Sequence, residues 1–153
     1  MRRVITATDA SGKSYFEIVA DAAPQFSELW TSDPRDPLSP AAAGALAPGG
    51  APLEPPAGGS SFRVFELPDD AVVAEYLRAQ GAAHGADASF HRTHTLDYVL
   101  VLDGEITLEL DRGSMTLGPG DCVVQRATHH AWRNKSGKPV RMAVVMLGLA
   151  RNR

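Results

Sequence analysis

The sequence predicts an all-β domain, either a sandwich or a barrel, with one short helix. Three observations support this prediction. The second half of the chain is a series of short strand-like segments, glycine- and proline-containing turns separate them, and one segment alone has clear helical spacing. A length of 153 residues is that of one ordinary domain. We therefore expect a single domain over residues 1–153, with its barrel core at about residues 62–149.

The N-terminal part begins with strands, expected within residues 1–32 at Ser14–Val19 and Ser27–Thr31. Residues 33–60 then hold seven of the eleven prolines and five of the fourteen glycines. Proline lacks a backbone donor and glycine loses the most backbone entropy on ordering, so this stretch is expected to be a long loop. Loops of this length are either functional or mobile.

After the loop, the sequence predicts a strand at Phe62–Leu67 and then the helix at Ala71–Gln80. Asp69 and Asp70 stand where a helix N-cap belongs, apolar residues recur at helical spacing, and Gly81 ends the run. We expect this helix to pack on the exterior of the barrel.

The remaining chain is predicted to be strands joined by tight turns. Asp103-Gly104 is the strongest short hairpin signal, and it joins Leu96–Leu102 to Glu105–Leu110, whose apolar and polar residues alternate. Further strands are expected at Met115–Leu117, Cys122–Arg126, His129–Asn134 and Val140–Leu149.

Composition excludes several classes of protein. With 44% hydrophobic and 22% charged residues, neither disorder nor a coiled coil is expected. The net charge is −3 without a clustered basic stretch, which disfavours nucleic-acid binding, and no apolar run reaches the about 20 residues of a membrane span. The single cysteine, Cys122, excludes a disulfide framework and is expected to be buried. Arg2 and Arg3 precede no apolar run of a secretory signal, so a cytoplasmic location is expected.

The histidines suggest where chemistry takes place. Four of the five form two pairs, His91/His94 and His129/His130, which can lie on neighbouring strands of a barrel. On an extended strand, His91 and Asp97 share one face. If both residues and His130 point inward, two imidazoles and one carboxylate meet, a set that suits Fe(II), Zn, Mn or Ni.

Two segments resemble the conserved motifs of the cupin superfamily. Residues 91–105 resemble the first motif, and residues 118–125 continuing to 130–134 resemble the second, so that the resemblance covers about residues 88–148. The chain is similar to small single-domain bacterial cupins, which implies a double-stranded β-helix, or jelly-roll barrel, with a ligand or metal site inside. It also implies a homodimer, because members of the family usually pair through barrel strands.

This sequence departs from the usual motifs in its metal ligands. Asp97 stands where glutamate is usual, Thr93 takes the place of the second histidine, and His94 comes one residue late. The implied ligand set is therefore His91, Asp97 and His130, with His94 as an alternative. In the second motif, Gln125 replaces the usual proline and Ala127 the usual glycine.

Three hypotheses for function follow from these residues. The first is an enzyme that uses a divalent metal on a small organic substrate, as an oxygenase, decarboxylase or isomerase. The second is a metal-free dehydratase, isomerase or cyclase acting on an aromatic or polyketide-like substrate, with His130 and His91 as acid and base beside Asp97. The third is a non-catalytic sensor of a small ligand. In each case the substrate pocket is expected to include Thr93, Gln125, Trp132 and Tyr98.

Overall fold

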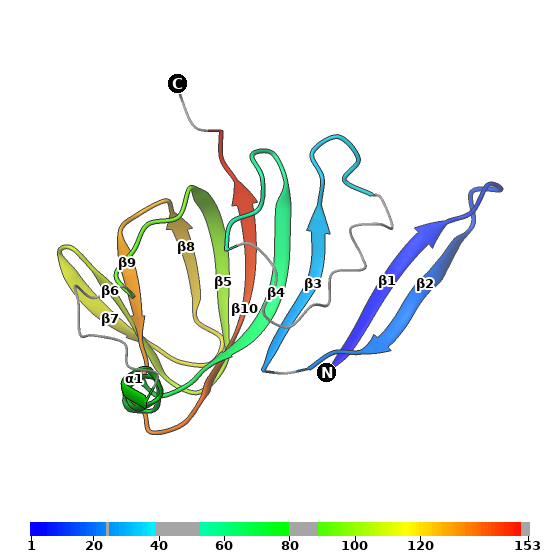
Figure 1. The fold of residues 1–153 in the computed structure, drawn as a ribbon. Coiled ribbons are helices and arrows are strands. Elements are labelled where there is room, and N and C mark those ends of the chain that lie inside the picture. Colours follow the sequence, from blue (N-terminus) through cyan, green and yellow to red (C-terminus); the bar gives the residue numbers. More distant parts are fainter. Residues whose placement is uncertain (24, 39–52, 80–88, 151–153) are drawn as a thin grey trace.

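The computed structural model describes residues 1–23, 25–38, 53–79 and 89–150. Two antiparallel sheets curve around a common interior and form a barrel, beside which a two-stranded arm stands apart (Figure 1). This confirms the predicted all-β architecture, a double-stranded β-helix with one short helix. No helix in these parts of the chain is long and apolar enough to cross a membrane.

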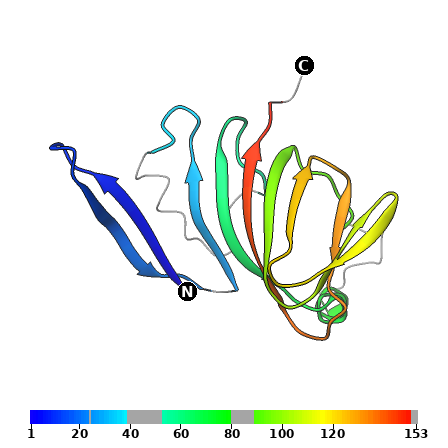
Figure 2. The ribbon, with the colours of Figure 1, turned by 180° about the vertical axis from the view of Figure 1, so that it is seen from behind.

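The larger sheet has five strands in the order β3-β4-β10-β5-β8, and the smaller has three in the order β7-β6-β9. Figure 2 shows from behind how the smaller sheet faces the larger one. The strands of the larger sheet are β3 (Phe26–Ser32), β4 (Ser60–Leu67), β5 (Thr95–Asp103), β8 (Cys122–Arg126) and β10 (Val140–Gly148). Those of the smaller sheet are β6 (Ile106–Leu110), β7 (Gly113–Leu117) and β9 (His130–Arg133).

The arm consists of β1 (Arg2–Thr8) paired with β2 (Ser14–Asp21). Sequence reasoning missed β1 and found β2. A hydrogen bond from Arg3 Nε to Leu29 O, 2.7 Å long, connects the arm to the barrel. Val4 and Val19 are cross-strand partners on one face of the arm and are 47% and 59% exposed.

The turn at Asp103-Gly104 is present, but the hairpin predicted there is wrong. Strand β5 pairs with β10 and β8, whereas β6 pairs with β7 and β9, so this turn carries the chain from one sheet to the other. Gly104 has φ of +84°, and a Cβ there would lie 2.9 Å from Val140 Cγ2. Turn residues favour a chain reversal, but they do not determine which strands pair after it.

The apolar core fills one end of the barrel. Burial alternates along β5 and β10, as expected for strands with one face inward. Each fully buried aliphatic side chain contributes about 1.5–3 kcal/mol to folding. The buried apolar side chains are Val99, Val101, Ile106, Leu108, Leu117, Val140, Met142, Val144 and Met146.

Helix α1 (Asp70–Ala79) is the one helix among the described residues and confirms the predicted segment, although Gln80 lies outside them. It begins at the expected cap, because Ala71 N donates to Asp69 Oδ1 at 2.9 Å. Figure 1 shows α1 outside the barrel, below the strands. Asn134, at the end of β9, fixes the start of the helix, since its backbone N donates to Asp70 Oδ1 at 3.0 Å.

Part of the predicted loop at residues 33–60, namely residues 39–52, lies outside the described residues. The described residues that follow pack at the end of β10. Gly58 N donates to Gly148 O and Gly148 N donates to Gly59 O. Leu53 O accepts a hydrogen bond of 3.3 Å from Arg63 Nη1 on β4. This part of the segment is therefore attached to the barrel.

Candidate functional site

Polar side chains gather at one end of the barrel interior. Cross-strand register places the polar residues Ser61, Asp97 and Gln125 in one row across β4, β5 and β8, with Met146 of β10, at the margin of the apolar core, between Ser61 and Asp97. All four are buried, with at most 6% of each residue exposed. Because the apolar core fills the other end, we take this polar end of the interior as the candidate functional site.

His91 and His130 meet at this end, as the two histidine pairs predicted. Their backbones form an isolated antiparallel bridge, in which each N donates to the other's O at 2.8 Å. The ring centroids are 4.8 Å apart and the ring planes are inclined at 46°. His130 is buried and His91 is half-buried. The bridge therefore places two imidazoles side by side.

Backbone carbonyls orient both rings. His91 Nδ1 lies 2.8 Å from Ser89 O, and His130 Nδ1 lies 2.9 Å from Thr128 O. A carbonyl only accepts, so Nδ1 carries the hydrogen in each neutral ring and Nε2 keeps its lone pair. Each imidazole can thus take up a proton or bind a ligand through Nε2.

Burial lowers the pKa of His130, and the neighbouring His91 and His129 act in the same direction. The hydrogen bond to Thr128 O and the charge of Asp97 oppose this shift. Because the pKa lies below its ordinary value of 6.5, the ring is neutral near pH 7. His130 is therefore suited to act as a base.

Burial raises the pKa of Asp97, and the charge of Glu54 adds to this effect. A hydrogen bond with Thr95 and the charges of His130 and Arg63 lower it in part. Asp97 Oδ1 is buried and has no hydrogen-bond partner among the described residues. A buried carboxyl oxygen without a partner is costly, and such atoms are characteristic of functional sites. Asp97 Oδ1 is thus a buried acceptor that no described residue satisfies.

A buried ionic cluster on β3 and β4 was missed by sequence reasoning. Arg63 Nη2 lies 3.0 Å from Glu28 Oε2, and the two side chains are 8% and 1% exposed. Ser61 Oγ donates to Glu28 Oε1 at 2.5 Å and accepts from Arg63 Nε at 2.9 Å. Ser61 and Arg63 alternate with exposed Phe62, which was a signal for an inward polar face. The partner Glu28 was not predictable without the pairing of β3 with β4.

Of the predicted pocket residues, Thr93 and Gln125 are buried at the polar end and Trp132 is half-buried. The Trp132 ring packs edge-on at 6.3 Å from the His130 ring. Tyr98 is not brought to them. It follows Asp97 on β5, so it points to the opposite face and is 48% exposed. The prediction that Tyr98 lines the substrate pocket is therefore wrong.

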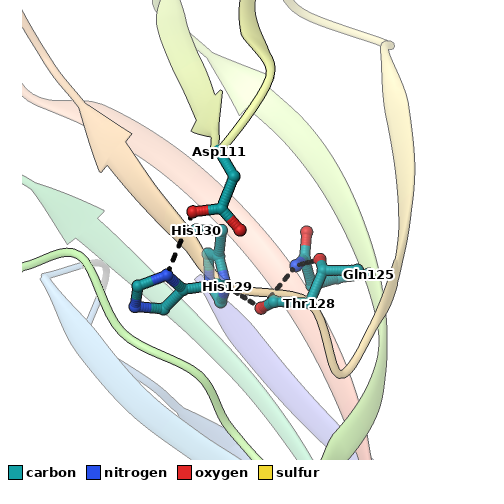
Figure 3. Close-up of polar contacts among 5 residues, drawn as sticks. All are labelled: Asp111, Gln125, Thr128, His129 and His130. Carbon is teal, nitrogen blue, oxygen red and sulfur yellow. Dashed lines mark hydrogen bonds and ion pairs between the residues drawn. The ribbon is translucent and has the colours of Figure 1, made fainter.

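Two other expectations concern the outer surface. His129 faces away from His130, as predicted, and its Nδ1 lies 3.3 Å from Asp111 Oδ1 (Figure 3). Cys122 was expected to be buried, but it is exposed. Strand β8 is an edge strand, and its inward position nearby is taken by Gln125.

The structure does not bring together the full set of metal ligands that the sequence predicted. Among the described residues, no three His, Cys, Asp or Glu side chains are grouped so that they could hold a metal ion. Thr93, at the position of the usual second histidine, accepts a hydrogen bond of 2.8 Å from Thr95 Oγ1. His94 precedes β5 and completes no such group. Among the described residues, the set His91, Asp97, His130 and His94 is therefore not assembled as a group of three or more ligands.

Comparison with known proteins identifies the region that carries this site. Residues 79–146 match the family described as the cupin domain. The match includes His91, Asp97 and His130 and excludes the cluster on β3 and β4. The resemblance predicted from the two motifs is confirmed.

Two curated relatives each match part of this chain. The phomopsin biosynthesis cluster protein C' of Diaporthe leptostromiformis is 51% identical over 61 residues, which are 39% of this chain and 32% of that protein. The cupin-domain-containing oxidoreductase fogC of Aspergillus ruber is 42% identical over 69 residues, which are 42% of this chain and 34% of that protein. The match thus spans about a third of the length of each relative. Because these relatives are fungal, the bacterial part of the expected resemblance is not confirmed.

Among solved structures, a cupin superfamily protein from Desulfitobacterium hafniense is 20% identical, with a TM-score of 0.43. The likeness covers 68% of this chain and 73% of that protein. A Cupin 2 conserved barrel domain protein from Salinispora arenicola is 16% identical and has the same TM-score of 0.43. It covers 67% of this chain and 71% of that protein.

Proposed function

Residues 79–146 of this chain match the cupin domain, and from this premise we propose a cupin-type enzyme that moves protons on a small organic substrate. The carrying observation is the His91–His130 bridge, in which backbone carbonyls take the Nδ1 atom of both rings, while the buried Asp97 interacts electrostatically with His130. The names of the relatives, which include an oxidoreductase and a biosynthesis cluster protein, support an enzyme-like role. We propose an aromatic or polyketide-like carbonyl compound as the substrate.

The proposed step is an isomerisation or a dehydration next to a carbonyl group. His130 Nε2 takes the proton of a C–H bond adjacent to the carbonyl, and the electron pair of that bond forms the enolate. In an isomerisation, the proton returns to a different carbon. In a dehydration, the electron pair expels a β-hydroxyl group, which leaves as water with a proton supplied by protonated Asp97. The proton that His130 took up then returns to Asp97. Each route balances without an oxidant or a reductant.

The pKa shifts favour this division of roles. Burial keeps His130 neutral, so that it accepts a proton near pH 7, and burial also favours the protonated form of Asp97. Two titratable groups whose environments move their pKa values in opposite directions are the usual basis of an acid–base pair.

A deuterium-exchange assay tests the proposal. A panel of β-hydroxy ketones and aromatic ketones is incubated in deuterated water with chelator-treated wild-type protein, and exchange and water loss are followed by NMR. We expect H130Q to lose at least about 100-fold in rate, the usual scale of general-base catalysis. The matched control is H129Q, which removes the neighbouring outward histidine and is expected to keep the wild-type rate.

Metal dependence is the second candidate, because carbonyl-bound Nδ1 atoms also orient metal-binding imidazoles and Asp97 Oδ1 has no hydrogen-bond partner. A divalent ion, Fe, Zn, Mn or Ni, would be held by His91 and His130. Elemental analysis of the untagged protein and of H130A separates the two candidates. One metal per chain that is lost in H130A, with activity abolished by chelation, would replace the acid–base proposal. Recovery of a tightly bound ligand without turnover would instead support the sensor.

We also propose a homodimer that pairs through the outer face of the larger sheet. Phe62, Tyr98 and Val124 lie in one cross-strand row there and are 40%, 48% and 56% exposed. Light scattering tests this with Y98E, which should give a monomer. The control Y76E changes a 64% exposed tyrosine on α1 and should leave the mass unchanged.

A cytoplasmic setting is proposed as well, since a free exposed cysteine suits a reducing compartment.

A further inference from the structure

The connection between β8 and β9 carries a hydrogen-bond arrangement that ends on His130 (Figure 3). Gln125 turns its amide toward Thr128, where Nε2 donates to the backbone O at 3.3 Å and also contacts Oγ1. The same backbone O accepts from His130 Nδ1 at 2.9 Å. Both lone pairs of one carbonyl are therefore used, one by Gln125 and one by His130.

Gln125 is buried on the interior face of the barrel, although its amide group contacts the loop before β9. Gln125 is only 3% exposed and is the cross-strand partner of Asp97, so it lies on the interior face at the polar end. Its amide nitrogen nevertheless contacts the loop. A buried amide group is costly without partners, and here Thr128 provides them.

The backbone between Gln125 and Thr128 is strained at Ala127. Ala127 has φ of +50°, and it alone among the described non-glycine residues has a positive φ. The left-handed conformation is unfavourable for alanine, because its Cβ lies too close to the following carbonyl oxygen. Such strain is held in place by surrounding contacts and is concentrated at functional sites. The hydrogen bonds of Gln125 to Thr128 are contacts that hold this loop.

We propose that Gln125 and Thr128 are positioning residues that hold the ring of His130 with its hydrogen on Nδ1 and its lone pair on Nε2. The inference rests on the proposed function, in which Nε2 of His130 is the base. Without the Gln125 amide, the Thr128 carbonyl is held by one partner fewer, and the ring is free to adopt the other tautomer. In that tautomer Nε2 already carries a hydrogen and accepts none.

The test is a direct measurement of the His130 tautomer by two-bond ¹⁵N–¹H correlation on histidine-labelled protein without substrate. Wild-type protein should show a protonated Nδ1 and an unprotonated Nε2. Q125M removes the polar atoms at similar volume and should shift the tautomer ratio about fivefold, the scale of one neutral hydrogen bond. An unchanged ratio in Q125M would overturn the proposal.

Two further variants exclude a general structural effect. Val123 is on β8, as Gln125 is, and its half-buried side chain packs against the core. V123A should therefore lower the stability of the protein without changing the tautomer of His130. If V123A shifts the ratio as much as Q125M does, Gln125 has no positioning role. T128V should shift the ratio and T128S should restore it, and because residue 128 is exposed these variants carry the test even if Q125M does not fold.

The readout also separates this inference from the proposed function. A tautomer shift in Q125M together with full activity in H130Q would refute the function and leave the positioning role intact. Loss of activity in H130Q with an unchanged tautomer in Q125M would refute only the positioning role.

Discussion

His91 and His130 join the two sheets of the barrel, because their backbone bridge connects the segment before β5 in the larger sheet to the first residue of β9 in the smaller one. The ring pairing is thus a consequence of barrel closure. A disturbance of the bridge should change both the separation of the imidazoles and the fit between the sheets.

The pH dependence of stability should report on His130. Its pKa is lower in the folded state than its ordinary value of 6.5, so below about pH 6.5 the unfolded chain binds the proton more tightly. The free energy of unfolding should therefore fall as the pH drops from 8 to 5. Urea denaturation of H130Q should show a shallower fall than that of wild type or of the control H129Q. Parallel curves for H130Q and wild type would contradict this.

Asp97 should contribute to the pH dependence of stability with the opposite sign to His130. Its pKa is raised in the folded state, so its contribution to stability is present below its ordinary value of 3.8 and is lost as the pH rises through the folded pKa. D97N removes the ionisation and should raise the melting temperature at pH 7 while the activity is lost. A D97N protein that melts below wild type at pH 7 would show that the ionised carboxylate is stabilised by its surroundings.

Relief of the strain at Ala127 should stabilise the protein. Glycine adopts φ of +50° without a Cβ penalty, so A127G should gain up to about 1 kcal/mol, after the entropy that it adds to the unfolded chain. A127V places a β-branched side chain there and should lose more than about 1 kcal/mol. Guanidinium denaturation measures both. Equal stability of the two variants would contradict this prediction, because it would mean that the backbone at residue 127 leaves the left-handed conformation at no cost.

Asn134 should be structural, although it matches the second motif. Its side chain is fully buried and makes hydrogen bonds with Leu67, Ser136 and Lys138. N134A should cost roughly 2–4 kcal/mol, because several buried partners are left unpaired. Thermal unfolding checks this. The folded fraction of N134A should keep the wild-type tautomer of His130, and a changed tautomer would give Asn134 a role in the site.

The Glu28–Arg63 pair should show strong coupling in a double-mutant cycle. Either E28Q or R63M alone leaves a partner buried without its counterpart and should cost about 3–5 kcal/mol. The double variant E28Q/R63M should cost less than the sum of the two, by more than about 1 kcal/mol. Additive losses in urea denaturation would indicate that water already separates the pair.

The parts of the site that follow from local alternation were predictable. Thr93 and Asp97 share the interior face because side chains alternate along an extended chain. The same rule places Tyr98 outside, so its assignment to the pocket conflicted with the alternation that placed Asp97. The turn at Asp103-Gly104 was also predictable, whereas the sheet to which the next strand belongs was not.

Properties that depend on pairing between distant segments could not be predicted. Glu28 meets Arg63 only because β3 pairs with β4 across the long proline- and glycine-rich segment. Whether His91, Asp97 and His130 come close enough to hold a metal is a question of register and barrel curvature. Residue types in a motif do not determine either quantity.

The position of β10 constrains the order in which the chain can fold. This strand lies between β4 and β5 in the larger sheet, yet it is the last strand in the sequence. During synthesis, β4 and β5 emerge from the ribosome long before the strand that joins them, so their exposed edges must wait unpaired. Folding of the larger sheet is therefore expected to be slow, because it must wait for β10, and a chaperone that shields strand edges should increase the yield of folded protein.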